Sequence, residues 1–120
     1  MRVVAAPDKF RGTASAVAVA AAVARSVVDA GGSAVEVPMA DGGEGTLEAL
    51  GGPNRTTRVT GPLGRPVEAS WRLDGSTAVI EMALTSGLLL AGGSDGNRAL
   101  DATTAGTGEL IRLAVEQGAR

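Results

Sequence analysis

The first 38 residues contain two short apolar runs with a helical segment between them, and this order constrains the fold more than any other feature. Residues 2–6 (RVVAA) lie directly before a proline, and residues 33–38 (SAVEVP) end in one. Residues 14–30 repeat apolar side chains at helical spacing, with Thr13 or Ser15 available as a cap and a glycine pair as a stop. A strand, a helix and a strand in this order predict the start of a parallel α/β sheet, with residues 2–6 as a buried strand.

After a short predicted helix at residues 46–50, the character of the sequence changes. Residues 55–60, 66–73 and 77–83 are rich in β-branched side chains or alternate with a period of two, and glycine-containing turns separate them. Close strands joined by tight turns indicate antiparallel hairpins. We therefore place a boundary near Thr60, between a Rossmann-like start and a different α+β unit.

The predicted domains are incomplete in the chain as it stands. Residues 1–60 supply only the N-terminal part of a Rossmann-like domain, and residues 61–120 supply part of a second α/β domain. The last predicted helix runs from Gly108 to Gln117, with Thr107 as its cap. Because a parallel sheet must be covered on both faces, we expect the chain to be the front part of a longer protein, with a complete 120-residue domain as the alternative.

The chain has no histidine and no cysteine, which removes several kinds of chemistry. Histidine bases, cysteine nucleophiles, disulfides and zinc sites are excluded, so carboxylates, hydroxyls, arginines, backbone amides and the single lysine, Lys9, remain. A net charge of −2 without a basic run, with Phe10 and Trp71 as the aromatic residues, gives no reason to expect nucleic acid. No apolar stretch approaches the roughly 20 residues of a membrane span, so a soluble intracellular protein is expected.

The strongest candidate site follows the second predicted strand and opens a helix, where α/β proteins bind ligands. Its three glycines allow backbone N–H groups to converge on an anion. Its two carboxylates would repel phosphate unless Mg²⁺ lies between them, and Mg²⁺ takes one or two carboxylates together with substrate oxygens. We therefore expect a metal-bound phosphate here, with an ordinary glycine-rich turn as the alternative. This acidic glycine loop consists of Asp41, Gly42, Gly43, Glu44, Gly45 and Thr46.

A second candidate loop, residues 8–13, follows the first predicted strand and should lie at the same edge of the sheet. Lys9 and Arg11 could neutralise phosphate charge, and Arg11 could hold a carboxylate or phosphate through two hydrogen bonds. Asp8 could accept a proton or orient a hydroxyl group. For Lys9 by itself, a solvated surface charge is the preferred interpretation.

Two further candidates lie in the second half of the chain. Residues 103–109 (TTAGTGE) place hydroxyls and glycines before a helix, a pattern that suits anion contacts and helix capping equally. Glu81 lies in an apolar run, where a carboxylate needs a partner or a function, although its alternation with Ile80 and Met82 also permits a solvent-facing position. The candidate substrate or phosphate contacts in these two places are Glu81, Thr103, Thr104, Gly106 and Thr107.

Standard nucleotide-binding signatures are missing from the sequence. The P-loop requires Gly-Lys-Ser/Thr, whereas the only lysine is Lys9. The Gly106-Thr107-Gly108 segment lacks the third glycine of the Rossmann fingerprint. Any use of ATP must therefore rely on another design.

Three segments in this order make the sequence resemble the bacterial glycerate kinase family that lacks a P-loop: APDKFRGTASA from Ala5, VPMADGGEGTLEAL from Val37 and TTAGTGELI from Thr103. VTGPLGRPVEA and TAVIEMALTSGL lie between them and add to the similarity. Members of this family are considerably longer, so the chain resembles their N-terminal part. The family commonly has a serine and a lysine where this chain has Lys9 and Arg11.

The resemblance implies a Rossmann-like domain built from both ends of the complete chain, with a second domain inserted. It also implies ATP-dependent phosphorylation of D-glycerate with Mg²⁺ in the cytoplasm, and it allows a homo-oligomer. Asp41 would accept the glycerate hydroxyl proton or bind Mg²⁺ with Glu44, the loop glycines would present backbone donors, and Arg11 would hold the substrate carboxylate or a phosphate. A metal-dependent phosphohydrolase and a noncatalytic ligand-binding fragment are the alternatives.

Overall fold

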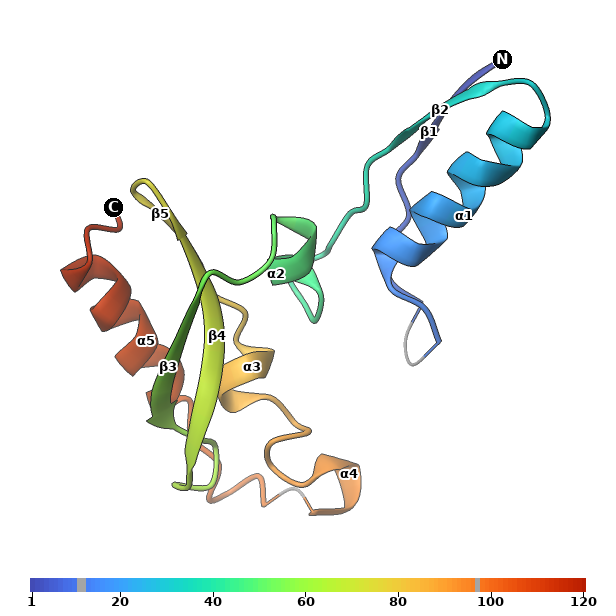
Figure 1. The fold of residues 1–120 in the computed structure, drawn as a ribbon. Helices are drawn as coiled ribbons and strands as arrows, with labels where there is room; N and C mark the ends of the chain where they lie inside the picture. The colour runs from blue at the N-terminus through green and yellow to red at the C-terminus, as the bar shows by residue number, and fades with distance from the viewer. Residues whose placement is uncertain (11–12, 97) are drawn as a thin grey trace. The chain divides into compact units, whose positions relative to one another are not determined.

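The computed structural model describes residues 1–10, 13–96 and 98–120. Contacts divide the chain into two compact units, Met1–Ala49 and Leu50–Arg120, which are described separately. No helix among the described residues is long and apolar enough to cross a membrane. The elements labelled in Figure 1 are β1 (Arg2–Ala5), α1 (Ala16–Asp29), β2 (Ser33–Glu36), α2 (Thr46–Ala49), β3 (Arg55–Thr60), β4 (Pro66–Asp74), β5 (Thr77–Val79), α3 (Ala83–Ser86), α4 (Gly93–Gly96) and α5 (Ala105–Glu116).

The first unit confirms the predicted strand, helix and strand. β1 and β2 are parallel, with Arg2 opposite Ser33 at one end of the pairing, and α1 packs against both strands. The Ser15 hydroxyl caps α1 by accepting a hydrogen bond of 3.2 Å from the Ala18 N–H group. Gly31 has a φ of +78° directly after the helix, a conformation that glycine adopts without strain.

The sequence predicts that the strand at residues 2–6 is buried, and this prediction is wrong for one face of the sheet. Ala5 is buried beneath α1, whereas Val4 keeps 63% of its surface exposed and the paired Val35 keeps 41%. The two valines share the sheet face opposite Ala5, because neighbouring side chains of a strand alternate. Within this unit α1 therefore covers one face of the sheet, and the other face carries the exposed side chains of Val4 and Val35.

The second unit confirms the predicted antiparallel hairpins. β3, β4 and β5 pair in that order, and α5 packs on β3. The fully buried Trp71 lies at the centre of this core and donates from its indole nitrogen to the Thr57 hydroxyl at 3.0 Å. The core consists of Val59, Ala69, Trp71, Leu73, Leu110 and Ala114.

The division after Ala49 falls earlier in the chain than the boundary that the sequence suggested near Thr60. Strand β3 pairs with β4 along its whole length, from Arg55 opposite Trp71 to Thr60 opposite Pro66. This pairing places residues 55–60 in the second unit. The sequence pattern alone could not locate the division, because only a short loop separates α2 from β3.

Two details of the second unit differ from the sequence predictions. The strand expected at residues 77–83 ends at Val79, and the chain then turns into α3. The last helix begins earlier than expected, with Thr104 rather than Thr107 as its N-cap residue. The earlier start places Gly106 where a Cβ atom would lie 1.9 Å from the Thr60 carbonyl oxygen, so the absent side chain lets α5 approach β3 closely.

Candidate functional site

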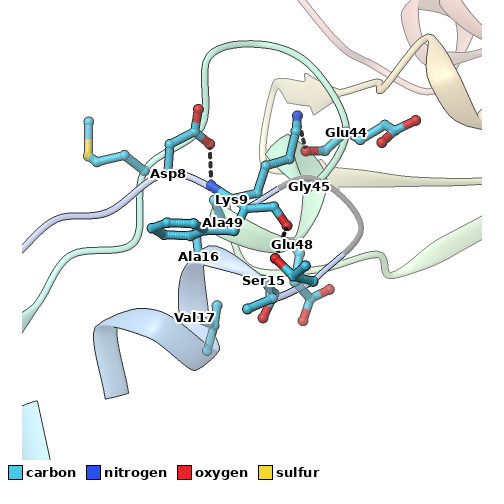
Figure 2. A pocket seen from close by; sticks show the side chains of 13 residues that line it. Asp8, Lys9, Ser15, Ala16, Val17, Glu44, Gly45, Glu48 and Ala49 are labelled. Atoms are coloured by element: carbon cyan, nitrogen blue, oxygen red, sulfur yellow. Dashed lines mark hydrogen bonds between the residues drawn. The ribbon is translucent and has the colours of Figure 1, made fainter. Parts of the chain in front are cut away.

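The loop after β1 and the acidic glycine loop after β2 meet in the first unit. The Lys9 Nζ atom donates a hydrogen bond of 2.6 Å to the Glu44 carbonyl oxygen (Figure 2). The same Nζ atom lies 3.7 Å from an Asp41 carboxylate oxygen. The interpretation of Lys9 as a merely solvated charge is therefore wrong, since its ammonium group joins two loops that are more than 30 residues apart.

Internal hydrogen bonds hold the acidic glycine loop in shape. The Asp41 carboxylate accepts a hydrogen bond of 2.9 Å from the Gly43 N–H group, and the Thr46 hydroxyl donates to the Gly43 carbonyl at 2.7 Å. Gly42 and Gly45 each have a φ of +92°, a backbone conformation that residues other than glycine rarely adopt. The Asp41 side chain nevertheless keeps 63% of its surface exposed, so it can meet a ligand.

Two neighbouring hollows open on this part of the first unit. The larger, of about 380 Å³, is lined by Asp8 and by apolar side chains such as Val17 and Ala49 (Figure 2). Phe10 and Met39 line it as well. The second, of about 340 Å³, is lined by Asp41 and Gly43. Lys9 and Glu44 line both hollows, which have the size of small-molecule sites.

The structure describes only some of the candidate residues in the loop after β1. Asp8 lies at the larger hollow, and one of its carboxylate oxygens accepts a hydrogen bond of 2.7 Å from the Lys9 backbone N–H group. Arg11 lies outside the described residues, so its contact with a carboxylate or phosphate stays a prediction. The structure thus brings Asp8, Lys9 and the acidic glycine loop together.

Residues 103–109 make structural contacts within the second unit. The Thr107 hydroxyl lies 2.6 Å from that of Thr85 and 2.9 Å from that of Ser86. The Thr103 hydroxyl accepts a hydrogen bond from the Ala105 N–H group, at the start of α5. These hydroxyls join α3 to α5 and support the start of the helix; their role as ligand contacts stays a prediction.

Glu81 is buried, with 5% of its surface exposed, so the solvent-facing alternative is wrong. It follows β5 closely and precedes α3. Its burial agrees with the view that a carboxylate in an apolar run has a partner or a function. The predicted contact of Glu81 with substrate stays a prediction.

The sequence profile of the Glycerate kinase family matches residues 3–120. The chain belongs to the glycerate kinase family. It is 46% identical to the glycerate 2-kinase of Escherichia coli (strain K12) and 45% identical to the glycerate kinase of Bacillus subtilis (strain 168). Each alignment covers 99% of this chain and 33% of the relative, so the chain spans about a third of their length.

A solved structure agrees with this assignment to the glycerate kinase family. A crystal structure of a protein assigned as glycerate kinase 2, from Salmonella typhimurium LT2, superposes with a TM-score of 0.75 and 40% sequence identity. The match covers 99% of this chain and 34% of that chain. The mixed α/β fold of the two units is thus a part of the glycerate kinase fold.

The carboxylates of this member of the glycerate kinase family could bind Mg²⁺ only together with other oxygen ligands. Among the described residues, no three carboxylates gather into a group that could hold a metal ion. Asp41 and Glu44, however, are exposed oxygen donors that line one polar hollow. Mg²⁺ commonly binds one or two carboxylates and completes its shell with water and phosphate oxygens, so the two residues fit that pattern.

Sequence reasoning placed Lys9 in a candidate loop but missed its contact with the acidic glycine loop. The position of Lys9 directly after Asp8 was the available signal, because the loops after two parallel neighbouring strands share one edge of the sheet. That signal predicted nearness to the acidic glycine loop. It did not reveal the hydrogen bond to the Glu44 carbonyl, which depends on the conformation of both loops.

Proposed function

We propose that the full-length protein is a glycerate kinase that transfers the γ-phosphoryl group of ATP to a hydroxyl group of D-glycerate. The observation that carries this proposal is the match of the glycerate kinase family to residues 3–120. The names of the relatives support it, since several are called glycerate kinase or glycerate 2-kinase. A cytoplasmic location is part of the proposal.

The acidic glycine loop is the proposed place of the chemistry. Phosphoryl transfer needs positioning and charge stabilisation more than covalent catalysis. As the substrate oxygen bonds to the γ-phosphorus, its proton passes to the exposed carboxylate of Asp41, and the bond from that phosphorus to ADP breaks. The Gly43 N–H group, which donates to Asp41 at 2.9 Å, orients the carboxylate for this task.

The other loop residues have supporting parts in the proposal. With Asp41 as the base, Glu44 would hold Mg²⁺, and in the alternative arrangement Asp41 would bind the metal together with Glu44 instead of taking the proton. When bound, Mg²⁺ would offset the negative charge of the phosphates. Asp8, at the larger hollow, would orient a substrate hydroxyl. Arg11 would hold the substrate carboxylate or a phosphate, a role that rests on the sequence alone.

The test is an assay of the full-length protein with ATP, Mg²⁺ and D-glycerate. We expect ADP to form only when D-glycerate is present, in equal amount to a phosphoglycerate whose phosphorylated position is identified by NMR. A phosphohydrolase would release inorganic phosphate from a phosphorylated substrate without an acceptor. A noncatalytic binding protein would bind glycerate without forming ADP, and either result would refute the kinase.

A further inference from the structure

We propose that Lys9 is a positioning residue, which holds the acidic glycine loop in its working shape before substrate binds. This inference rests on the proposed kinase function for its catalytic consequence. Its structural part, that Lys9 sets the conformation of residues 41–46, stands independently. It assigns a function to the one lysine of the chain.

The first argument is the set of atoms around the ammonium group. Lys9 Nζ donates to the Glu44 carbonyl at 2.6 Å and lies 3.7 Å from the Asp41 carboxylate, while 21% of its side-chain surface is exposed. One group therefore contacts both ends of the Asp41 to Glu44 segment. The ammonium group thus donates a hydrogen bond to one residue of the loop and forms an ion pair with another.

The second argument is the space above Gly43. A Cβ atom at this position would lie 2.9 Å from Lys9 Nζ and 3.0 Å from an Asp41 carboxylate oxygen. A side chain at this position would therefore displace the Lys9 ammonium group from its place over the loop. Gly42 and Gly45 differ, because each has a positive φ and open space around the missing side chain. Lys9 and the loop thus fit each other at Gly43.

The third argument is chemical. The Lys9 ammonium group is occupied by protein oxygens, at the wall that the two hollows share. Its main effect is to fix the loop before a ligand arrives, which lowers the cost of ordering the site.

The first experiment compares Lys9→Met and Lys9→Arg in the full-length protein. We expect Lys9→Met to lower kcat by about 10- to 100-fold, the effect of a small misplacement, while KM for ATP changes by less than about threefold. Lys9→Arg keeps the cation and should recover most of the loss. Arg25→Met, which removes an exposed cation from α1, is the matched control and should leave kcat unchanged. An unchanged kcat in Lys9→Met would overturn the proposal, as would a large rise in KM at constant kcat.

The second experiment measures the coupling between Lys9 and Gly43. Gly43→Ala should lower kcat more in the wild-type background than in Lys9→Ser, because the shorter side chain leaves room for the Cβ atom. Gly45→Ala, whose cost comes from its φ of +92°, should lower kcat equally in both backgrounds. Equal effects of Gly43→Ala in the two backgrounds would contradict the proposed fit.

A readout without catalysis separates this inference from the kinase proposal. The amides of Gly43, Thr46 and Ala49 are hydrogen-bonded within or beside the loop, so their hydrogen exchange reports on its conformation. We expect exchange in this segment to be at least about tenfold faster in Lys9→Met at unchanged Tm, which corresponds to a modest loss of local stability. Unchanged exchange would refute the role of Lys9 even in an active kinase. Faster exchange in a protein without glycerate-dependent ADP formation would support Lys9 and refute only the kinase.

Discussion

Glu109 on α5 accepts two hydrogen bonds from Thr60, the last residue of β3. One carboxylate oxygen receives the Thr60 backbone N–H group at 2.9 Å, and the other receives the Thr60 hydroxyl at 2.7 Å. These bonds, the backbone one first, hold the pKa of Glu109 below its ordinary value of 4.5, and Arg112 adds to the effect. The ionised Glu109 carboxylate therefore links α5 to β3.

Replacement of Glu109 should make the stability of the full-length protein less dependent on pH. A carboxylate whose pKa is lowered in the folded state stabilises that state above its unfolded pKa, near 4.5. The stabilisation is lost as the pH falls through the lower, folded pKa. Glu109→Gln should therefore lower Tm at pH 7, and the difference from wild type should shrink below about pH 4.5. Thermal unfolding from pH 3 to pH 7 measures it, and a difference that grows with acidity would disprove the assignment.

A side chain at Gly106 should destabilise the second unit. A Cβ atom there would lie 1.9 Å from the Thr60 carbonyl, so α5 would have to move away from β3. We expect Gly106→Ala to cost about 1–3 kcal/mol in urea unfolding of the full-length protein, the usual range for overpacking. Gly108→Ala is the matched control, since it lies in the same helix with nothing within 4 Å of its Cβ position. It should raise stability by about 0.5–1 kcal/mol, and similar effects at both positions would contradict the close-approach argument.

Thr107 offers a test between a structural role and contact with a ligand. Its hydroxyl lies within hydrogen-bonding distance of Thr85 and Ser86, and Thr85 is fully buried. Thr107→Val should cost about 1–3 kcal/mol of stability, because it leaves buried hydroxyls with fewer partners. Thr107→Ser keeps the hydroxyl and should cost less. An increase in KM for ATP or D-glycerate in Thr107→Val, without loss of stability, would instead support the ligand contact that the sequence suggests.

The predictions from sequence succeeded where the signal is local. The strand, helix and strand of the first unit follow from apolar periodicity and from glycines after the helix, so the limits of α1 came close to those expected. The cap of α5 was placed three residues late, because its start depends on the contact between Gly106 and the Thr60 carbonyl, far away in the sequence. No pattern in the sequence indicates that α5 and β3 come this close together.

The same distinction applies to the candidate site. The acidic glycine loop was recognisable from its composition and from its place after a strand. Whether Lys9 is solvated or bonded, however, depends on a distance of 2.6 Å to Glu44, 35 positions further along the chain. The burial of Glu81 likewise has no local signal, because the strand predicted over residues 77–83 ends at Val79 and Glu81 lies in the turn that leads into α3.

Asp41→Asn is the sharpest test of the proposed chemistry in the full-length protein. An asparagine can still accept the hydrogen bond from the Gly43 N–H group, which Asp41 accepts at 2.9 Å, so the loop should keep its shape. It cannot take a proton from the substrate, and we expect kcat to fall by about 10²- to 10⁴-fold, the usual contribution of a general base. Steady-state kinetics at saturating ATP and D-glycerate measure the loss, and unchanged hydrogen exchange of residues 41–46 confirms the intact loop. Asp29→Asn, an exposed carboxylate at the end of α1, should have no effect on kcat. Full turnover by Asp41→Asn would exclude Asp41 as the base, because an amide cannot replace a carboxylate in proton transfer.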